Sequence, residues 1–289
     1  MEEIKNEKIS ISTSSYSAEL CSVKNVVTGE ELMWQADPKY WGRHCPMLFP
    51  TVGAVWEGRY LHRGVWRNMP KHGFMQQREF ELREQTADSV TYFAHDNHDT
   101  RLIYPFEFEL EQKFRLEGSV VHVEWTVRSE GSDDMPFQIG GHPSFFFRGW
   151  KPGQDVKGFL QFDISSPESA TVGCEGCLGA ERYRLNAPDG VMEVHDADFQ
   201  VDSIIIDHSQ VHSITLMDTE RRPVVRVSSQ APVFLVWSPY GIEAPFVCLE
   251  PWYGLCDAEG YNGEFIDRPY TNIAPAGGEW KGGYDIEVL

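Results

Sequence analysis

The chain has 289 residues, and its 25 lysines and arginines stand against 44 aspartates and glutamates, giving a formal net charge of −19. Such a surface repels phosphate groups, so we expect neither nucleic acid nor an anionic membrane as a partner, whereas a neutral small molecule meets no penalty. Because 41% of the residues are hydrophobic, a chain of this length can bury a large core.

Targeting signals and cysteines point to the cytoplasm. Residues 1–6 lack the apolar stretch of a secretion signal, and no later segment approaches the roughly 18 apolar residues of a membrane span. Six cysteines are too sparse for a disulfide scaffold in a chain of this length. Cys174 and Cys177 form a Cys-x-x-Cys pair, but no second pair accompanies it, so we expect free thiols in a loop and no metal site.

Alternation of apolar and polar residues dominates the chain and predicts strands. In chain order these are Ile9–Thr13, Glu79–Glu84, Val90–His95, Phe106–Leu110, Val121–Val127, Pro136–Gly141, Phe159–Asp163, Ser213–Met217, Val224–Ser228, Pro232–Trp237, Phe246–Glu250 and Tyr284–Val288. The fourth and fifth are joined through Glu117-Gly118-Ser119 and predict an antiparallel hairpin with one wet face.

Two stretches lack this alternation. Residues 166–198 predict a long excursion over the surface, with a linker between domains as the alternative, and residues 262–283 predict an irregular wrap before the final strand. Few segments show a helical period, and 25 glycines and 17 prolines are spread throughout. We therefore expect an all-β protein, a large antiparallel β-sandwich forming a single domain over residues 1–289, either as a monomer or as a homodimer.

Candidate functional residues occur in three short frames that contain Gly or Pro. They are Lys71-His72-Gly73-Phe74, Gly140-Gly141-His142-Pro143 and Leu249-Glu250-Pro251-Trp252. A carboxylate and imidazoles can act as general base and acid near neutral pH. Trp252 offers a flat apolar face of the kind on which the C–H groups of a sugar ring pack. Together the frames predict proton transfer on a sugar.

The alternation of side chains along a strand predicts on which face two of these residues lie. The apolar residues of 136–141 point one way, so His142 lies at the end of the face that points away from the core. Within 246–250, Glu250 shares a face with apolar residues, a setting that raises the pKa of a carboxyl toward usefulness as a base. Pro251 cannot extend the strand's hydrogen bonding, so we expect the strand to end there and leave Glu250 at the sheet's rim.

Taken alone, each residue has a plainer explanation. A histidine beside Gly and Pro, such as His72, is usually a turn residue or a core histidine. A glutamate at a strand end is usually solvated, and tryptophan is highly buried on average. The joint occurrence of the three frames is what favours a functional explanation.

These frames resemble the signatures of a known family. His72-Gly73-Phe74, Gly141-His142-Pro143 followed by Phe145, and Glu250-Pro251-Trp252 look like those of the aldose 1-epimerase (galactose mutarotase-like) proteins, specifically the shorter bacterial branch. The stretch from Arg43 to Gly53 is similar to that branch's opening strand. The resemblance covers residues 41–252 and implies a β-supersandwich whose concave sheet holds one sugar, with no metal or organic cofactor.

The resemblance also implies roles. Glu250 would be the general base that takes the proton from the anomeric hydroxyl, and His142 the general acid that protonates the ring oxygen, on opposite sides of the ring. The ring opens to the aldehyde, the C1–C2 bond rotates, and reclosure on the other face gives the other anomer. His72 would hold a sugar hydroxyl or the ring oxygen.

Departures from the branch's pattern concern substrate recognition. Where the branch commonly has arginine, this chain has Ala54 and Gln76, and both changes remove bidentate donors for a phosphate or carboxylate. Arg43 is a candidate replacement donor. The family also places an aspartate near the sugar, which we match to Asp202, with Asp207 second. The expected substrate-binding set is therefore Arg43, Gln76 and Asp202, together with the tryptophan of the third frame, Trp252.

Three functions are compatible with these residues. The leading hypothesis is an epimerase acting at the anomeric centre of a free hexose. A sugar-binding or sensing protein that keeps the cleft without turnover is the second, and the losses at positions 54 and 76 favour it. A glycoside hydrolase is the third, but it needs two carboxylates flanking one bond, and only Glu250 stands in a distinctive frame.

Overall fold

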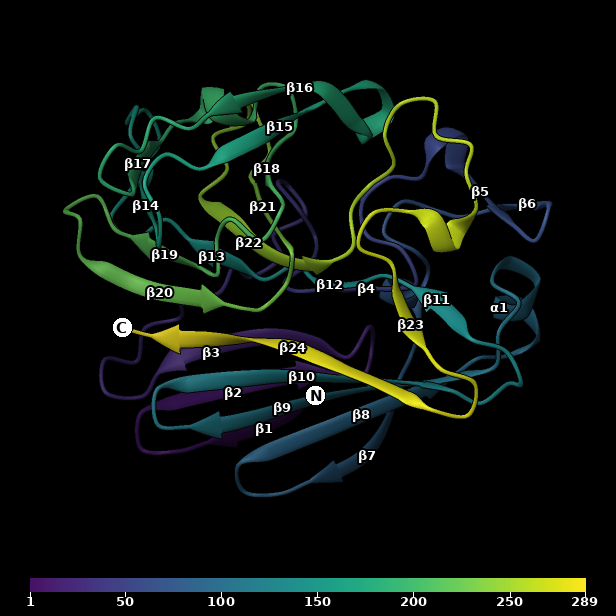
Figure 1. Cartoon of the computed structure of the whole chain (residues 1–289). Helices are drawn as coiled ribbons and strands as arrows, with labels where there is room; N and C mark the ends of the chain where they lie inside the picture. Colours follow the sequence, from purple (N-terminus) through teal and green to yellow (C-terminus); the bar gives the residue numbers. More distant parts are fainter.

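The structure, a computed structural model, describes all residues 1–289 and is an all-β protein, as predicted. Two large antiparallel sheets form most of it (Figure 1). The nine-stranded sheet has the order β17 (Val191–Val194), β14 (Gly158–Phe162), β19 (Ser213–Met217), β20 (Pro223–Ser228), β24 (Glu279–Val288), β10 (Val120–Ser129), β9 (Phe108–Glu117), β8 (Ser89–His95) and β7 (Glu81–Gln85). The eight-stranded sheet has the order β16 (Leu178–Arg184), β15 (Glu168–Val172), β18 (Ser203–Ile206), β21 (Val233–Trp237), β22 (Phe246–Tyr253), β12 (Ile139–Gly141) and β4 (Met47–Leu48), with β13 (Ser144–Phe146) also on β22.

Smaller elements complete the chain. The short strands are β1 (Glu2–Lys5), β2 (Ile9–Ser14) and β3 (Glu19–Asn25) in one sheet, β11 (Met135–Phe137) with β23 (Asn272–Ala274), and β5 (Arg59–His62) with β6 (Val65–Asn68). The helical elements are α1 (His98–Ile103) and the 3-10 turns η1 (Trp56–Gly58), η2 (Met75–Gln77), η3 (Cys174–Gly176), η4 (Asp196–Phe199) and η5 (Phe265–Asp267). None of these helices is long and apolar enough to cross a membrane.

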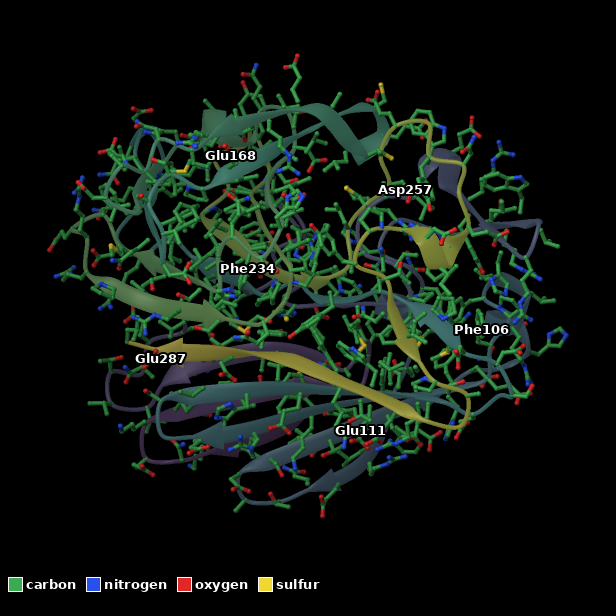
Figure 2. All side chains as sticks on the ribbon, in the orientation of Figure 1. Phe106, Glu111, Glu168, Phe234, Asp257 and Glu287 are labelled. Carbon is green, nitrogen blue, oxygen red and sulfur yellow. The ribbon has the colours of Figure 1, made fainter.

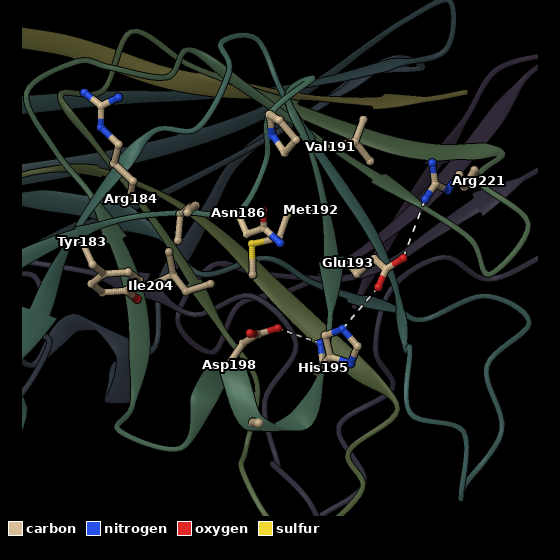
Figure 3. A pocket seen from close by; sticks show the side chains of 13 residues that line it. Tyr183, Arg184, Asn186, Val191, Met192, Glu193, His195, Asp198, Ile204 and Arg221 are labelled. Carbon is tan, nitrogen blue, oxygen red and sulfur yellow. Dashed lines mark hydrogen bonds and ion pairs between the residues drawn. The ribbon is translucent and has the colours of Figure 1, made fainter.

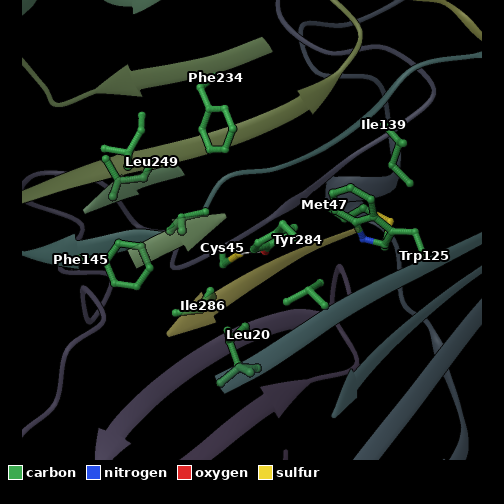
Figure 4. Close-up of a cluster of buried hydrophobic side chains, with 14 of the residues drawn as sticks. Leu20, Cys45, Met47, Trp125, Ile139, Phe145, Phe234, Leu249, Tyr284 and Ile286 are labelled. Atoms are coloured by element: carbon green, nitrogen blue, oxygen red, sulfur yellow. Dashed lines mark hydrogen bonds between the residues drawn. The ribbon is translucent and has the colours of Figure 1, made fainter. Parts of the chain in front are cut away.

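A continuous core of 60 buried side chains joins the layers. Side chains fill the space between the sheets, with Phe234 of β21 among them (Figure 2). In Figure 4, Leu249 of the eight-stranded sheet and Ile286 of the nine-stranded sheet point into the same cluster. Burial at roughly 25 cal/mol per Å² of apolar surface makes this cluster the main stabilising term.

Strand β22 is buried on both faces, which decides where a site can form. Val247 and Leu249 belong to the large core, whereas Cys248 belongs to a separate cluster on the opposite face. Period-two alternation therefore places Glu250 on the face of Cys248 and away from the large core; the sequence predicted the shared face but not which way it points.

The predicted hairpin is confirmed and is longer than expected. Strands β9 and β10 pair along ten residues each, with Leu116 opposite Val121, and Gly118 closes the turn at φ +58°. The prediction covered the middle of β10 but only the first three residues of β9. The missed part of β9 alternates as well, and its Phe114 and Leu116 are buried.

Residues 166–198 are not an irregular excursion, and that prediction was wrong. They contain β15, β16 and β17, besides η3 and η4. β16 lies at the edge of the eight-stranded sheet and five of its seven residues are exposed, while β17 lies at the edge of the nine-stranded sheet. An edge strand with solvent on most of its surface leaves no apolar alternation in the sequence.

Residues 262–283 are also more regular than predicted. They include β23 and the start of β24, which begins at Glu279 and not at Tyr284. Glycines inside β24 obscured its period. A Cβ at Gly283 would lie 2.1 Å from the carbonyl oxygen of Val123 in β10, so the close approach of the two backbones requires glycine there.

Three other strand predictions need correction. The predicted strand over 136–141 is split into β11 and β12, which belong to different sheets. The stretch from Arg43 to Gly53 contributes only the two residues of β4. Strand β22 continues through Pro251 to Tyr253, so Glu250 lies inside the strand and not at its rim. Pro251 is tolerated because the neighbouring ladder is interrupted between β12 and β13.

Candidate active site

The residues singled out in the sequence meet in one cavity of about 370 Å³ on the face of the eight-stranded sheet that points away from the large core. The seven are Arg43, His72, Gln76, His142, Asp202, Glu250 and Trp252. The other lining residues are Trp41, Pro46, Gly53, Lys71, Gly176, Ser203, Ile205, Leu235, Trp237 and Cys256. The cavity thus has a sheet floor from β18, β21 and β22 and loop walls.

At the centre of the cavity, an imidazole contacts a carboxyl. Gly140 pairs with Trp252 and Ser144 with Cys248, so the same register places His142 directly opposite Glu250. Directly opposed residues of antiparallel strands project from the same face. The Nε2 atom of His142 accordingly lies 3.2 Å from Oε1 of Glu250.

Burial shifts the proton affinity of both groups. The Glu250 side chain is fully buried and that of His142 is 9% exposed. Loss of solvation raises the pKa of Glu250 well above its ordinary value, and it lowers the pKa of His142 to about 3. Burial therefore disfavours both the ionised carboxylate of Glu250 and the protonated imidazole of His142. Together the two side chains hold one proton.

A hydrogen bond from Trp252 fixes the carboxyl. The indole Nε1–H of Trp252 donates to Oε2 of Glu250 at 3.2 Å, which partly offsets the effect of burial on the carboxyl pKa. Since Trp252 follows Glu250 by two residues in β22, both project from one face of the strand. Oε1 of Glu250 has no hydrogen-bond partner of its own and faces His142.

His72 reaches the cavity from an unusual backbone conformation. Its φ is +65°, and the following Gly73 has φ +70°. A Cβ on Gly73 would lie 2.1 Å from the carbonyl oxygen of Phe49, so only glycine fits there. The N–H of Gly53 donates to Nδ1 of His72 at 3.1 Å. In the neutral ring the proton is therefore on Nε2, which makes that atom a donor.

Aromatic rings enclose the histidines. Trp41 stacks on His142 with ring centres 4.8 Å apart, and Trp237 meets His142 edge-on at 5.9 Å. His72 is edge-on to both His142 and Trp252, at 5.7 Å in each case. A stacked indole face stabilises an imidazolium when His142 carries one.

The charged groups of the cavity wall are already paired. Nε of Arg43 lies 3.3 Å from Oε2 of the buried Glu19, and its Nη1 donates to the backbone oxygen of Gln76 at 2.9 Å. Lys71 Nζ lies 3.8 Å from Oδ2 of Asp202, whose side chain is 30% exposed. Nη2 of Arg43 is buried without a partner, but a bidentate fork needs two free nitrogens, so no such fork remains for an anionic substituent.

Comparisons with known proteins show the family of this chain. The sequence profile of the family described as aldose 1-epimerase matches residues 2–281. The chain belongs to the aldose 1-epimerase family. Protein LacX of Lactococcus lactis subsp. lactis is 28% identical over 303 residues, covering 99% of each chain.

Two solved structures resemble this aldose 1-epimerase family member along its whole length. A galactose mutarotase related enzyme from Lactobacillus acidophilus has a TM-score of 0.92 and 29% identity, covering 100% of this chain and 97% of its own. A galactose mutarotase-like protein from Lactobacillus casei ATCC 334 has a TM-score of 0.93 and 25% identity, covering all of both chains.

Sequence reasoning missed part of the wall of this epimerase-family cavity. Trp41, Trp237 and Lys71 carried no distinctive spacing, although Lys71 directly precedes His72 and Trp41 lies two residues before Arg43. Asp207, the second candidate for the aspartate that the family places near the sugar, does not line the cavity. It is held by Arg182, with distances of 2.7 and 2.6 Å, and by His208.

A second, larger cavity of about 620 Å³ lies between β16, β17 and η4 (Figure 3). It contains none of the seven candidate residues. His195 lies 3.5 Å from Glu193 there, and Glu193 lies 3.7 Å from Arg221, so its charged groups satisfy one another. All seven candidate residues line the smaller cavity instead.

Proposed function

We propose that this protein is a mutarotase that interconverts the α and β anomers of a free, uncharged hexose. The observation that carries the proposal is the buried contact between His142 and Glu250, a carboxyl and an imidazole that together hold one proton. Anomer exchange needs one proton to be removed from the anomeric hydroxyl and another to be delivered to the ring oxygen. Both oxygens are bonded to C1.

The pair can cycle between two forms with the same proton count. With Glu250 ionised and His142 protonated, the carboxylate takes the O1 proton while the imidazolium protonates the ring oxygen. The C1–O5 bond breaks, C1 and O1 become the aldehyde, and the pair is left as carboxylic acid and neutral imidazole. After rotation about C1–C2, the two transfers run backwards on the other face and restore the starting form.

Neighbouring groups support the charged form during this exchange. The Trp252 N–H stabilises the carboxylate, and the face of Trp41 stabilises the imidazolium. The acid and the base lie side by side, so both can reach the two oxygens bonded to C1. His72, as an Nε2–H donor, can hold a sugar oxygen next to them.

The test is the rate of anomer exchange in freshly dissolved α-D-glucose or α-D-galactose, followed by polarimetry or NMR. Glu250→Gln keeps the shape but removes the base, so we expect the enzymatic rate to fall by roughly 10²–10⁴-fold. Glu57→Gln, an exposed carboxyl outside the cavity, is the matched control. Equal rates for wild type and Glu250→Gln would sink the proposal.

The other two functions give different results. A sugar-binding protein without turnover predicts heat of binding in calorimetry but no acceleration of mutarotation. A glycoside hydrolase predicts release from chromogenic glycosides. The other carboxylate lining the cavity, Asp202, is paired with Lys71 and partly exposed, so it lacks the buried setting of Glu250. We expect no release.

A further inference from the structure

A buried thiol lies beside the acid–base pair and has no part in the reaction proposed above. Cys248 precedes Glu250 by two residues in β22, shares its face, and is fully buried. The potential ligand atoms of His142, Cys248 and Glu250 all lie within 4.8 Å of one another. This trio combines an imidazole nitrogen, a sulfur and a carboxylate oxygen, each on a rigid strand or beside one.

The distances suit a tetrahedral ion. Zinc–ligand bonds of about 2.0–2.3 Å put two tetrahedral ligands roughly 3.3–3.6 Å apart. The 3.2 Å between Nε2 of His142 and Oε1 of Glu250 is close to this value. The thiol, within 4.8 Å of both, needs a movement of the order of 1 Å, which a side-chain rotation supplies.

The trio also contains polar atoms without partners. Oε1 of Glu250 and Nδ1 of His142 are buried and make no hydrogen bond. Both residues line the cavity, so an ion held by them has a route in and a fourth position open to water or a sugar hydroxyl. The nearby cations are engaged elsewhere, Lys71 with Asp202 and Arg43 with Glu19. A net charge of −19 favours cation approach.

We propose that His142, Cys248 and Glu250 form a site for zinc or a similar thiophilic divalent cation. Binding displaces two protons to the buffer, the thiol proton of Cys248 and the one that His142 and Glu250 hold between them, and it occupies the atoms that transfer protons, so the ion inhibits the enzyme and is not a cofactor. The inhibition rests on the function proposed above, whereas binding of the ion does not.

Cobalt(II) added to protein freed of metal by a chelator is the direct probe, because a thiolate–cobalt bond produces its own charge-transfer absorption. We expect one ion per chain, with this band, in wild type. Cys248→Ser keeps the volume but removes the soft ligand, so the band disappears and the affinity falls roughly tenfold or more. Cys174→Ala, which removes the exposed thiol of the Cys-x-x-Cys pair, leaves band and affinity unchanged.

A second measurement connects the ion to the site. Zinc should slow anomer exchange in wild type and Cys174→Ala, reversibly with chelator, and much less in Cys248→Ser when each protein is compared with its own metal-free rate. Any of three results overturns the proposal. The cobalt–thiolate band survives in Cys248→Ser, it disappears in Cys174→Ala, or it is absent from wild type. Near-UV circular dichroism checks that Cys248→Ser is folded. If no variant turns over sugar, the cobalt titration still decides.

Discussion

Replacing Trp252 with phenylalanine tests how the carboxyl of Glu250 is kept usable as a base. The substitution keeps most of the ring but removes the Nε1–H that donates to Oε2 at 3.2 Å. A hydrogen bond to a charged group contributes about 1.5–3 kcal/mol, and this long one belongs at the lower end. Since 1.36 kcal/mol corresponds to one pKa unit, the pKa of Glu250 should rise by about one unit.

The sign of the effect on activity follows from the role of the group. The working form has Glu250 ionised and His142 protonated, and it is the minor form of the one-proton pair because burial favours the carboxylic acid and the neutral imidazole. A higher pKa of Glu250 makes this form rarer, and it moves the alkaline limb of the profile, where the pair loses its last proton, to higher pH. We expect kcat/KM on the plateau to be about tenfold lower in Trp252→Phe, with the alkaline limb displaced upward by about one pH unit. The assay is mutarotation across a pH series. A limb in the same place as that of wild type would refute the reasoning, because a purely structural loss lowers the rate without moving the limb.

Two stability predictions follow from features of the same site. Gly73→Ala should lower the free energy of unfolding by more than Gly29→Ala. Both glycines have positive φ, but a new Cβ at position 73 meets a carbonyl oxygen, whereas a new Cβ at position 29 meets open space. Urea denaturation measures both free energies, and equal losses would contradict the steric argument. Glu250→Gln should be as stable as wild type below the ordinary carboxyl pKa of 4.5 and more stable above it. Burial raises the pKa of Glu250 in the folded state, so folding takes up a proton between pH 4.5 and that raised pKa, and the stability of the wild type falls as the pH rises through this range. Glutamine does not ionise and has no such loss. A stability difference that shrinks with rising pH would contradict this sign.

The sequence predicted which residues line the cavity better than how they are arranged. Alternation correctly placed Glu250 on the same face as Phe246 and Cys248, because that rule needs only neighbours in the chain. The contact with His142 depends on the register between two strands 108 positions apart, which no local pattern contains. Pro251 misled the boundary prediction, since a proline is tolerated where the adjoining ladder is broken, and that break is a tertiary feature.

Two further strands show the same limit. β16 was missed because its side chains face solvent, and the first part of β24 because glycines replace apolar residues where β10 approaches. Cavity residues such as Trp41 lie in loops whose path depends on the rest of the fold. Periodic burial is what a sequence records most clearly, so strands at an edge or in close backbone contact escape it.

The position of β24 has a consequence for biosynthesis. This strand follows every other strand in the sequence, yet it lies in the middle of the nine-stranded sheet, hydrogen-bonded to β20 on one side and β10 on the other. Until Glu279–Val288 has been synthesised, those two strands present unpaired edges, and the sheet exists as two separate halves. A ribosome-bound chain lacking this segment should therefore depend on chaperones, and the sheet can close only after residue 288 has left the exit tunnel.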